Sequence, residues 1–185
     1  MCDVCGCGDT NLVSVDVHTS LLSQNARDAA HLRAHFLEDG VVAINLMGSP
    51  GSGKTALLEA TAKAFGDRRK LAAVSGDLAT SNDADRLAKV GIPSAAITTG
   101  TACHLDAKMV DDSLHGTEVG AAVHGCDFFF IENVGNLVCP AIYDLGQAAN
   151  VVALSVTEGE DKPLKYPVMF KNADIVRHPL VGRIV

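Results

Sequence analysis

The chain has 185 residues, which is enough for one domain of ordinary size and too few for two. Hydrophobic residues make up 48% of it, so a globular core is expected and disorder of the whole chain is excluded. The 15 Lys and Arg residues and 22 Asp and Glu residues give a net charge of −7, which argues against nucleic acid or an anionic membrane as a partner.

The first residues and the six cysteines indicate the compartment. The chain begins Met-Cys-Asp-Val-Cys, without the basic start or the apolar stretch of a signal peptide. Cysteines without a secretion signal indicate a reducing compartment, in which thiols bind metals or perform chemistry. The longest apolar run, residues 41–47, is far shorter than the roughly 20 residues of a membrane-spanning helix. We therefore expect a cytoplasmic protein with no membrane insertion.

The predicted elements fall into three parts along the chain. Residues 1–15 form a tail rich in Cys, Gly and Asp, and residues 16–40 form a helical lead-in with apolar side chains at steps of three and four. Beyond residue 40, apolar runs typical of buried strands alternate with helical patterns. We expect strands at 41–47, 70–74, 95–98, 127–131 and 151–156, and helices at 54–65, 83–90 and around 105–110. This order predicts an α/β fold, with a mainly parallel sheet covered by helices, over residues 41–185.

Residues 48–55 read GSPGSGKT and fit the phosphate-binding pattern G-x-x-x-x-G-K-[ST] at every position. The motif follows an apolar strand and opens a helix, so backbone N–H groups and the positive end of the helix dipole can surround phosphate oxygens. Lys54 would reach the β- and γ-phosphates, and the Thr55 hydroxyl would ligate Mg²⁺. The pattern predicts a nucleoside triphosphate site made of Gly48, Ser49, Pro50, Gly51, Ser52, Gly53, Lys54 and Thr55.

Two acidic residues follow predicted strands, at the edge where the phosphate loop lies. Asp77 comes after the second strand and Glu132 ends the Phe-rich strand. Carboxylates there can hold Mg²⁺ directly or through water, or orient an attacking water, although either could instead cap the next helix. Gly135, three residues after Glu132, lets the backbone approach a γ-phosphate. We expect Lys54, Asp77 and Glu132 to carry the hydrolysis.

Cys2, Cys5 and Cys7 form a C-x-x-C-x-C motif in the N-terminal tail. Three thiolates at this spacing can surround one soft cation, and the α-amino group is close enough to be a fourth ligand. Such a set suits Zn²⁺ in tetrahedral or Ni²⁺ in square-planar geometry, and the sequence alone does not choose between them. The alternative is an unstructured, oxidisable tail.

Cys103, His104 and Cys139 also follow predicted strands on the nucleotide edge. Three ligands are too few for a closed structural zinc site, but a twofold dimer would double the set and share a metal at its interface. Ordinary buried thiols are the alternative. Cys126 is interpreted as a core thiol. The remaining histidines are interpreted as surface or packing residues: His18, His31, His35, His115, His124 and His178.

Together these motifs resemble the nickel-incorporation GTPases of hydrogenase maturation, the HypB family. The match rests on the stretches MCDVCGCG, GSPGSGKT, GDLATSNDADR, TGTACHLDAKMV, FFFIENVGNLVCP and LSVTEGEDKPLKYPVMF, which extend from residue 1 to about residue 176. The resemblance implies a P-loop GTPase that dimerises with GTP bound and delivers nickel. It also implies two partners, a HypA-type nickel protein and the hydrogenase large subunit.

The resemblance assigns roles to the motif residues. It implies a tight N-terminal nickel site at Cys2, Cys5 and Cys7. It implies a second site, for nickel or zinc at the dimer interface, at Cys103, His104 and Cys139. Gly51, Lys54 and Thr55 match the residues that bind phosphate and Mg²⁺, with Asp77 and Glu132 as the acidic partners. Hydrolysis sensed between Glu132 and Gly135 would then shift Cys139 and change the affinity for metal.

The sequence departs from the family pattern near residue 177. The pattern would continue into a strand that ends in N-K-x-D, the motif that reads guanine, but here the sequence is RHPLVGRIV and contains no N-K-x-D. We therefore expect the last strand and helix to be lacking, which puts guanine selectivity and full stability in question. A frameshifted or truncated copy, or a real shortened variant, would explain the change.

Two other functions fit parts of the sequence. A nickel-binding storage or carrier protein with an impaired nucleotide site would explain the missing N-K-x-D, but the intact loop of residues 48–55 opposes it. An ATP-dependent small-molecule kinase would use the same loop, but it leaves the thiols and the Cys-His pair without a role.

Overall fold

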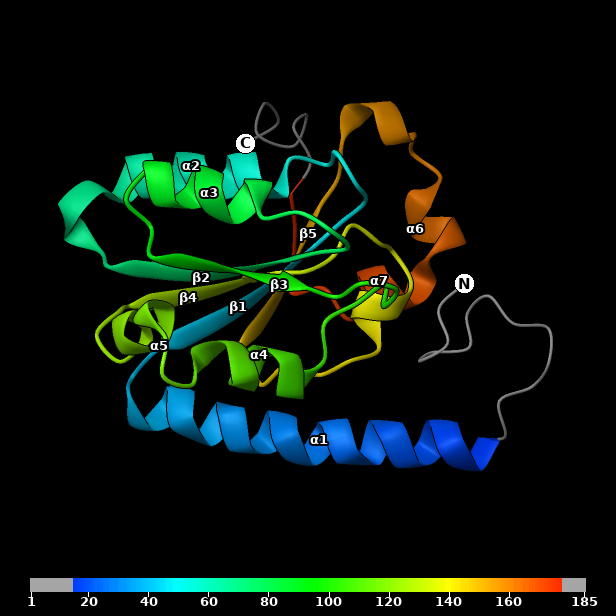
Figure 1. The fold of residues 1–185 in the computed structure, drawn as a ribbon. Helices are drawn as coiled ribbons and strands as arrows, with labels where there is room; N and C mark the ends of the chain where they lie inside the picture. The colour runs from blue at the N-terminus through cyan, green and yellow to red at the C-terminus, as the bar shows by residue number, and fades with distance from the viewer. Residues whose placement is uncertain (1–14, 178–185) are drawn as a thin grey trace.

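The computed structural model describes residues 15–177, in which helices and strands alternate (Figure 1). The strands are β1 (Val42–Met47), β2 (Leu71–Asp77), β3 (Ser94–Thr98), β4 (Phe128–Glu132), β5 (Ala149–Ala153) and β6 (Ile175–Arg177). The helices are α1 (Val15–Glu38), α2 (Lys54–Phe65), α3 (Asn82–Lys89), α4 (Ala107–Leu114), α5 (Glu118–Val123), α6 (Lys162–Lys165) and α7 (Pro167–Lys171). Short 3₁₀ turns occur at Gly66–Arg68, Cys139–Ala141 and Val156–Glu158.

The six strands form one sheet in the order β3-β2-β4-β1-β5-β6, and every neighbouring pair is parallel. In the centre, Ile44 of β1 lies between Phe130 of β4 and Ala149 of β5. Parallel strands bring their carboxyl ends to the same edge of the sheet, which is where open α/β sheets bind ligands. This arrangement confirms the predicted parallel α/β fold.

Helices cover both faces of the sheet (Figure 1), with α2 and α3 on one face and α1, α4 and α5 on the other. Successive side chains of a strand point to opposite faces, so neighbouring phenylalanines of β4 serve two cores. Phe129 packs with Leu32 and Phe36 of α1, whereas Phe130 packs with Leu58 of α2 on the opposite face. Burial on both faces explains why these strands are continuous apolar runs.

The predicted helical lead-in is confirmed as α1, which ends where the sequence places a glycine. Gly40 has a φ of 69°, and the Val41 N–H donates to the Phe36 carbonyl oxygen at 2.8 Å, a left-handed helix stop. The buried Asn25 joins α1 to the rest of the chain: its side chain donates to the Asp144 carbonyl and accepts from the Ala107 N–H at the start of α4.

The structure differs from the expected elements at three places. β2 continues to Asp77, so this acidic residue is the last of its strand rather than a residue beyond it. β5 ends at Ala153, because Ser155 and Glu158 form a capping box that starts a 3₁₀ turn. The third difference is β6, whose three residues pair with β5 and which was not among the expected strands. None of the helices in residues 15–177 is long and apolar enough to cross a membrane.

Candidate functional site

The loop between β1 and α2 surrounds one side of a cavity of about 490 Å³ at the carboxyl edge of the sheet. Gly51 and Gly53 have φ angles of 74° and 89°, which residues with a side chain rarely adopt. At Gly48, an added Cβ would lie 2.4 Å from the Ala153 carbonyl oxygen. The hydroxyl of Ser52 is buried and has no hydrogen-bond partner among the described residues, as expected of a donor that awaits a phosphate oxygen.

Lys54 lies folded into this loop. Its ammonium donates to the carbonyl oxygens of Gly48 at 3.3 Å and Ser49 at 3.2 Å, and the residue is only 8% exposed. Burial lowers the pKa of Lys54, and the carboxylate of Glu132 acts in the opposite direction. The loop therefore holds a cation beside the cavity before any anion arrives.

The Thr55 hydroxyl lies between two carboxyl groups. Its Oγ1 is 2.7 Å from Oε1 of Glu132 and 2.9 Å from Oδ1 of Asp83. A hydroxyl has a single proton and can donate to only one of them. Three oxygens gathered at this spot are the ligands that Mg²⁺ prefers, so the donor set fits the predicted magnesium ion.

Glu132 is the most deeply buried acid of this group, with 2% of the residue exposed. Burial raises the pKa of its carboxyl group, and the hydrogen bond from Thr55 acts in the opposite direction. The Ser75 hydroxyl lies 3.3 Å from its second oxygen. A bound cation would favour the ionised form that burial disfavours.

Asp77 also lines the cavity, and one oxygen of its carboxylate is engaged by the backbone. Its Oδ1 accepts from the N–H groups of Ala79 at 2.9 Å and Thr80 at 3.1 Å, and these bonds, that from Ala79 first, lower its pKa. Sequence reasoning missed Asp83, which the structure places against Thr55. The signal that could have found it is its position in the first turn of the helix after β2, at the same edge as Asp77.

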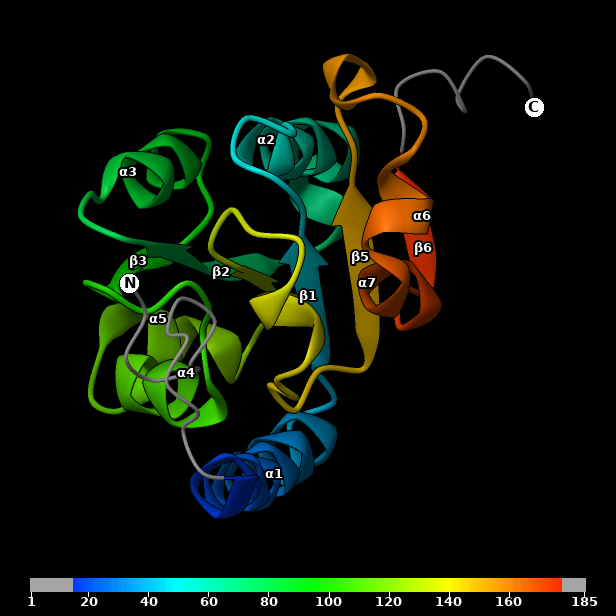
Figure 2. The ribbon, with the colours of Figure 1, turned by 90° about the vertical axis from the view of Figure 1, so that its right-hand side faces the viewer.

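The segment after β4 connects the phosphate-binding loop to the cysteines. Gly135 lies so close to the loop that an added Cβ would be 2.8 Å from the Pro50 nitrogen. The Asn136 N–H donates to the Gly48 carbonyl at 3.1 Å. In Figure 2 this segment, coloured yellow, crosses the carboxyl edge of the sheet beside the cyan loop before α2. Cys139 lies three residues after Asn136.

The structure brings Cys103, His104 and Cys139 together, as the sequence predicts. Their candidate ligand atoms all lie within 4.8 Å of one another, and the two Sγ atoms are 2.8 Å apart. Cys103 and His104 lie in the loop between β3 and α4, and Cys139 begins a 3₁₀ turn. Among the described residues this is the only such group of three or more Cys, His, Asp or Glu residues.

His104 is completely buried and stacks on the Tyr143 ring at a centroid distance of 3.9 Å. Burial lowers the pKa of the imidazole, so the neutral form that binds metals is favoured. Its Nδ1 is 3.9 Å from Sγ of Cys103, and its Nε2 is buried without a hydrogen-bond partner within residues 15–177. An imidazole and two thiols suit Ni²⁺ or Zn²⁺.

The other cysteines divide into two groups. Cys126 is buried in the core, and burial raises the pKa of its thiol to about 11, so it is the unreactive core thiol that the sequence predicts. The predicted ligands Cys2, Cys5 and Cys7 lie outside the described residues.

The geometry of the site agrees with known proteins. The pattern of one family, described as "CobW/HypB/UreG, nucleotide-binding domain", matches residues 42–176. The chain belongs to this family. Within it the HypB proteins are close relatives: "Hydrogenase maturation factor HypB" of Rhizobium leguminosarum bv. viciae is 51% identical over 164 residues, which are 88% of this chain and 53% of that protein.

Helicobacter pylori supplies a second relative and a solved structure. Its "Hydrogenase/urease maturation factor HypB" (strain ATCC 700392 / 26695) is 49% identical over 162 residues, 88% of this chain and 66% of that protein. The crystal structure of HypB from this species in complex with nickel superposes with a TM-score of 0.78 and 50% identity, and covers 83% of this chain and 70% of that one. The chain thus spans about half to two thirds of the length of these curated relatives. The resemblance to HypB and the P-loop fold are confirmed.

Proposed function

We propose that this protein binds and hydrolyses GTP and couples this reaction to the delivery of nickel during maturation of [NiFe]-hydrogenase. One observation carries the proposal. The segment from Glu132 to Cys139 contacts the phosphate-binding loop at Pro50 and Gly48 and ends at a thiol of the Cys-His cluster. One short piece of backbone therefore joins a nucleotide site to a metal site.

The residues around the cavity have separate tasks in the proposed reaction. Lys54 and the N–H groups of the loop bind the phosphates and stabilise negative charge that develops on them. Thr55, Glu132 and Asp83 hold Mg²⁺, with Asp77 shaping the adjoining turn. When bound, the ion neutralises charge on the β- and γ-phosphates. Glu132 can also orient the attacking water, because within residues 15–177 the one hydrogen bond to its second oxygen is the long one from the Ser75 hydroxyl, at 3.3 Å.

Nickel is the cargo of this proposal rather than a resident cofactor. Cys103, His104 and Cys139 supply three ligands, and a second copy of the chain would bring three more across a twofold axis. The proposal also includes the N-terminal Cys2, Cys5 and Cys7 as a second nickel site. The expected dimer with GTP bound, the HypA-type partner, the hydrogenase acceptor and a cytoplasmic location belong to the same proposal.

The coupling follows from the backbone contacts. The γ-phosphate would lie where Gly135 meets Pro50, so its release would free the segment that leads to Cys139. Moving one of three ligands by a fraction of an ångström is enough to weaken a metal site, because coordination distances are narrow. Hydrolysis would thereby lower the affinity of the cluster for nickel.

Substitution of Cys139 by Ala tests the coupling. We expect the wild-type protein to bind Ni²⁺ at this cluster with different affinities in its GTP-bound and GDP-bound forms. The Cys139→Ala variant should bind Ni²⁺ at least roughly tenfold more weakly there and lose the dependence on nucleotide, because one of three ligands is gone. Its affinity for nucleotide should stay near that of the wild type, since Cys139 does not line the cavity.

The matched control is Cys126→Ala, which removes a buried thiol that precedes β4, at the opposite end of the strand from Glu132, and that belongs to neither site, so nickel binding and its coupling should stay intact. If GTP still changes nickel affinity in the Cys139 variant, the coupling runs elsewhere. Calorimetric titrations with Mg²⁺-GTP and Mg²⁺-ATP complete the test. A preference for GTP supports the proposal, and equal or absent binding contradicts a GTPase function and favours a nickel-binding carrier.

A further inference from the structure

Two histidines on the exposed face of α1 point at each other. His31 and His35 are one helical turn apart, and their Nε2 atoms are 3.2 Å apart. The ring centroids are 4.5 Å apart, and the ring planes meet at 72°. Both residues are exposed, which is one of the two environments, surface or packing, expected for them from the sequence, where neither was given a ligand partner. Because the two residues are four positions apart in one helix, their side chains lie next to each other.

The distance between the two nitrogens suits chelation of one ion. Imidazole nitrogens bind first-row divalent metals at about 2.0–2.1 Å, so two of them 3.2 Å apart subtend an angle of roughly 100° at a shared metal. This value lies between the cis angle of an octahedral site and the tetrahedral angle. The two nitrogens are therefore close enough to bind one ion once it replaces the contact between them, and their shared helix limits the rotamer entropy lost on binding.

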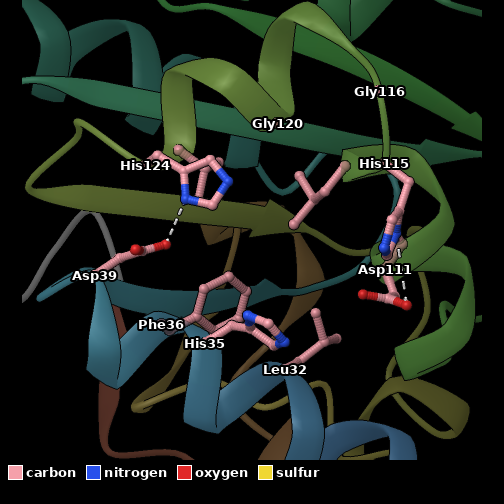
Figure 3. Close-up of a pocket in the computed structure, with 11 residues that line it drawn as sticks. Leu32, His35, Phe36, Asp39, Asp111, His115, Gly116, Gly120 and His124 are labelled. Atoms are coloured by element: carbon pink, nitrogen blue, oxygen red, sulfur yellow. Dashed lines mark hydrogen bonds and ion pairs between the residues drawn. The ribbon is translucent and has the colours of Figure 1, made fainter.

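The surroundings of the pair are open and carry more acidic than basic groups. His35 lines a pocket between α1 and the helices that follow β3, where Figure 3 shows its ring turned toward the side that carries Asp111 and His115. His31 lines the adjoining hollow, which also contains Asp111 together with Asp28 and Lys108.

The charged neighbours favour a cation at this position. Lys108 is already held by Asp112 at 2.7 Å, so its charge is largely balanced, and Arg27 is turned to Gln24. The carboxylates of Asp28 and Asp111 lie in the same hollow and attract a cation, while Asp28 also accepts from the Gln24 amide and Asp111 lies 3.7 Å from Nδ1 of His115. No carboxylate is close enough to make the pair part of a three-residue cluster among the described residues, so water would complete the coordination.

We propose that His31 and His35 form a binding site for a divalent transition metal of the nickel and zinc class, separate from the Cys103-His104-Cys139 cluster. Paired imidazoles are borderline-soft ligands that suit Ni²⁺, Cu²⁺ and Zn²⁺ and bind Mg²⁺ or Ca²⁺ poorly. The site is open on its outer side, so bound metal exchanges readily with solvent. The proposal needs neither GTP hydrolysis nor nickel delivery to hold.

The test follows each imidazole separately during titration of the full chain with Ni²⁺ under reducing conditions. Histidine-selective NMR resolves the ring signals, so filling of the thiol sites does not obscure the response of α1. We expect the signals of His31 and His35 to broaden together, at a lower Ni²⁺ concentration than those of His115 and His124. Each of the latter lies alone against a carboxylate: His115 beside Asp111 and His124 beside Asp39. Mg²⁺ at the same concentrations should leave all four unchanged.

Single substitutions then separate a chelate from two independent surface histidines. In His31→Gln, the remaining His35 should need roughly tenfold more Ni²⁺ or more, because it loses the intramolecular second ligand, and His35→Gln should do the same to His31. His115→Gln and His124→Gln are the matched controls and should leave the pair unaffected. All four side chains are exposed, so the variants should keep the wild-type circular dichroism spectrum. If His35 responds to the same Ni²⁺ concentration in His31→Gln as in the wild type, the proposal is overturned.

Discussion

At the scale of single residues, the hydroxyl of Thr55 shows how the cavity is prepared for a cation. It is shared between Asp83 and Glu132, yet it can satisfy only one of them. The carboxylate that receives no proton still lies close to Oγ1 of Thr55, so two oxygens face each other without a hydrogen bond between them. This arrangement is costly in the absence of a cation and favourable in its presence, so the positions of the three oxygens specify the ion.

Asp83 and Asp77 can be distinguished by substitution. We expect Asp83→Asn to raise the Mg²⁺ concentration needed for nucleotide binding by roughly tenfold, because it removes a charge beside the ion. Asp77→Asn should have a smaller effect on Mg²⁺, because its Oδ1 mainly accepts from the Ala79 and Thr80 N–H groups. The measurement is a Mg²⁺ titration of nucleotide binding at fixed GTP.

The control is Asp85→Asn. Asp85 lies in the same first turn of α3, but its carboxylate accepts from the Ser81 hydroxyl and does not line the cavity. Equal effects of Asp77→Asn and Asp83→Asn would contradict the assignment of Asp83 to the ion.

At the scale of elements, a chain of three amides, two of them fully buried, connects β1, β5 and the segment after β4 to the metal-binding loop. Asn133 follows β4, accepts from the Leu105 N–H at 3.1 Å and donates to Oδ1 of Asn45 in β1 at 3.2 Å. Asn45 in turn donates to Oδ1 of Asn150 in β5 at 3.0 Å. Leu105 directly follows His104, so Asn133 fixes the loop that carries two ligands of the cluster.

Replacement of Asn133 by Ala should loosen this loop. The Leu105 N–H and the side-chain oxygen Oδ1 of Asn45 would be buried without these partners. Each loss lowers the free energy of unfolding by about 1–3 kcal/mol. We expect lower stability in urea denaturation and weaker Ni²⁺ binding at the Cys103-His104-Cys139 cluster. The control is Asn172→Ala, since Asn172 is exposed and donates to a single carbonyl. Stability of Asn133→Ala equal to that of the wild type would show that the amide chain does not fix the loop.

The elements that the sequence predicts best are the central strands. Strands buried on both faces read as unbroken apolar runs, so β1 and β4 were predicted within one residue at each end. α5 was not predicted, because its six residues are too few to show a helical period and include a glycine. β6 was not predicted either, because its three exposed residues are too few to form an apolar run. It is a strand because it pairs with the neighbouring β5.

The candidate site was predictable where a local motif defines it. The loop of residues 48–55 and the group Cys103, His104 and Cys139 follow from motif and strand order, and the structure brings each set together. Asp83 and Asn133 belong to no local motif: the place of Asp83 in the first turn of α3 indicates the nucleotide edge but not its contact with Thr55, and nothing in the sequence indicates the hydrogen bonds of Asn133. Their roles depend on packing between elements, which one sequence does not reveal.

At the scale of the whole molecule, the buried Glu132 makes stability depend on pH. Burial raises the pKa of this carboxyl group above its ordinary value of 4.5, so the folded state holds the proton more tightly than the unfolded state does. The resulting contribution to stability is present below pH 4.5 and is lost as the pH rises through the raised pKa of the folded state.

The variant Glu132→Gln should lack this dependence. In the absence of Mg²⁺, we expect the free energy of unfolding of the wild type to fall relative to that of the variant as the pH rises from 4.5 through the raised pKa. Urea denaturation in a chelator over a series of pH values measures the difference. Glu160→Gln, which changes an exposed glutamate, should follow the wild type throughout. A constant difference between wild type and Glu132→Gln at all pH values would contradict the buried-acid explanation.

The strand order has a consequence for synthesis on the ribosome. β1 is made early, but its two neighbours in the sheet are β4 and β5, the last of which ends at Ala153. Until that residue has emerged, the central strand has no partner on one side, and the loop of residues 48–55 that it supports lacks its final packing against Ala153. A parallel sheet of this order requires distant segments to meet, which makes folding slow and leaves apolar strands open to aggregation meanwhile. The nascent chain therefore acquires its nucleotide site only after residue 153 has emerged, and its apolar β1 is open to aggregation until then.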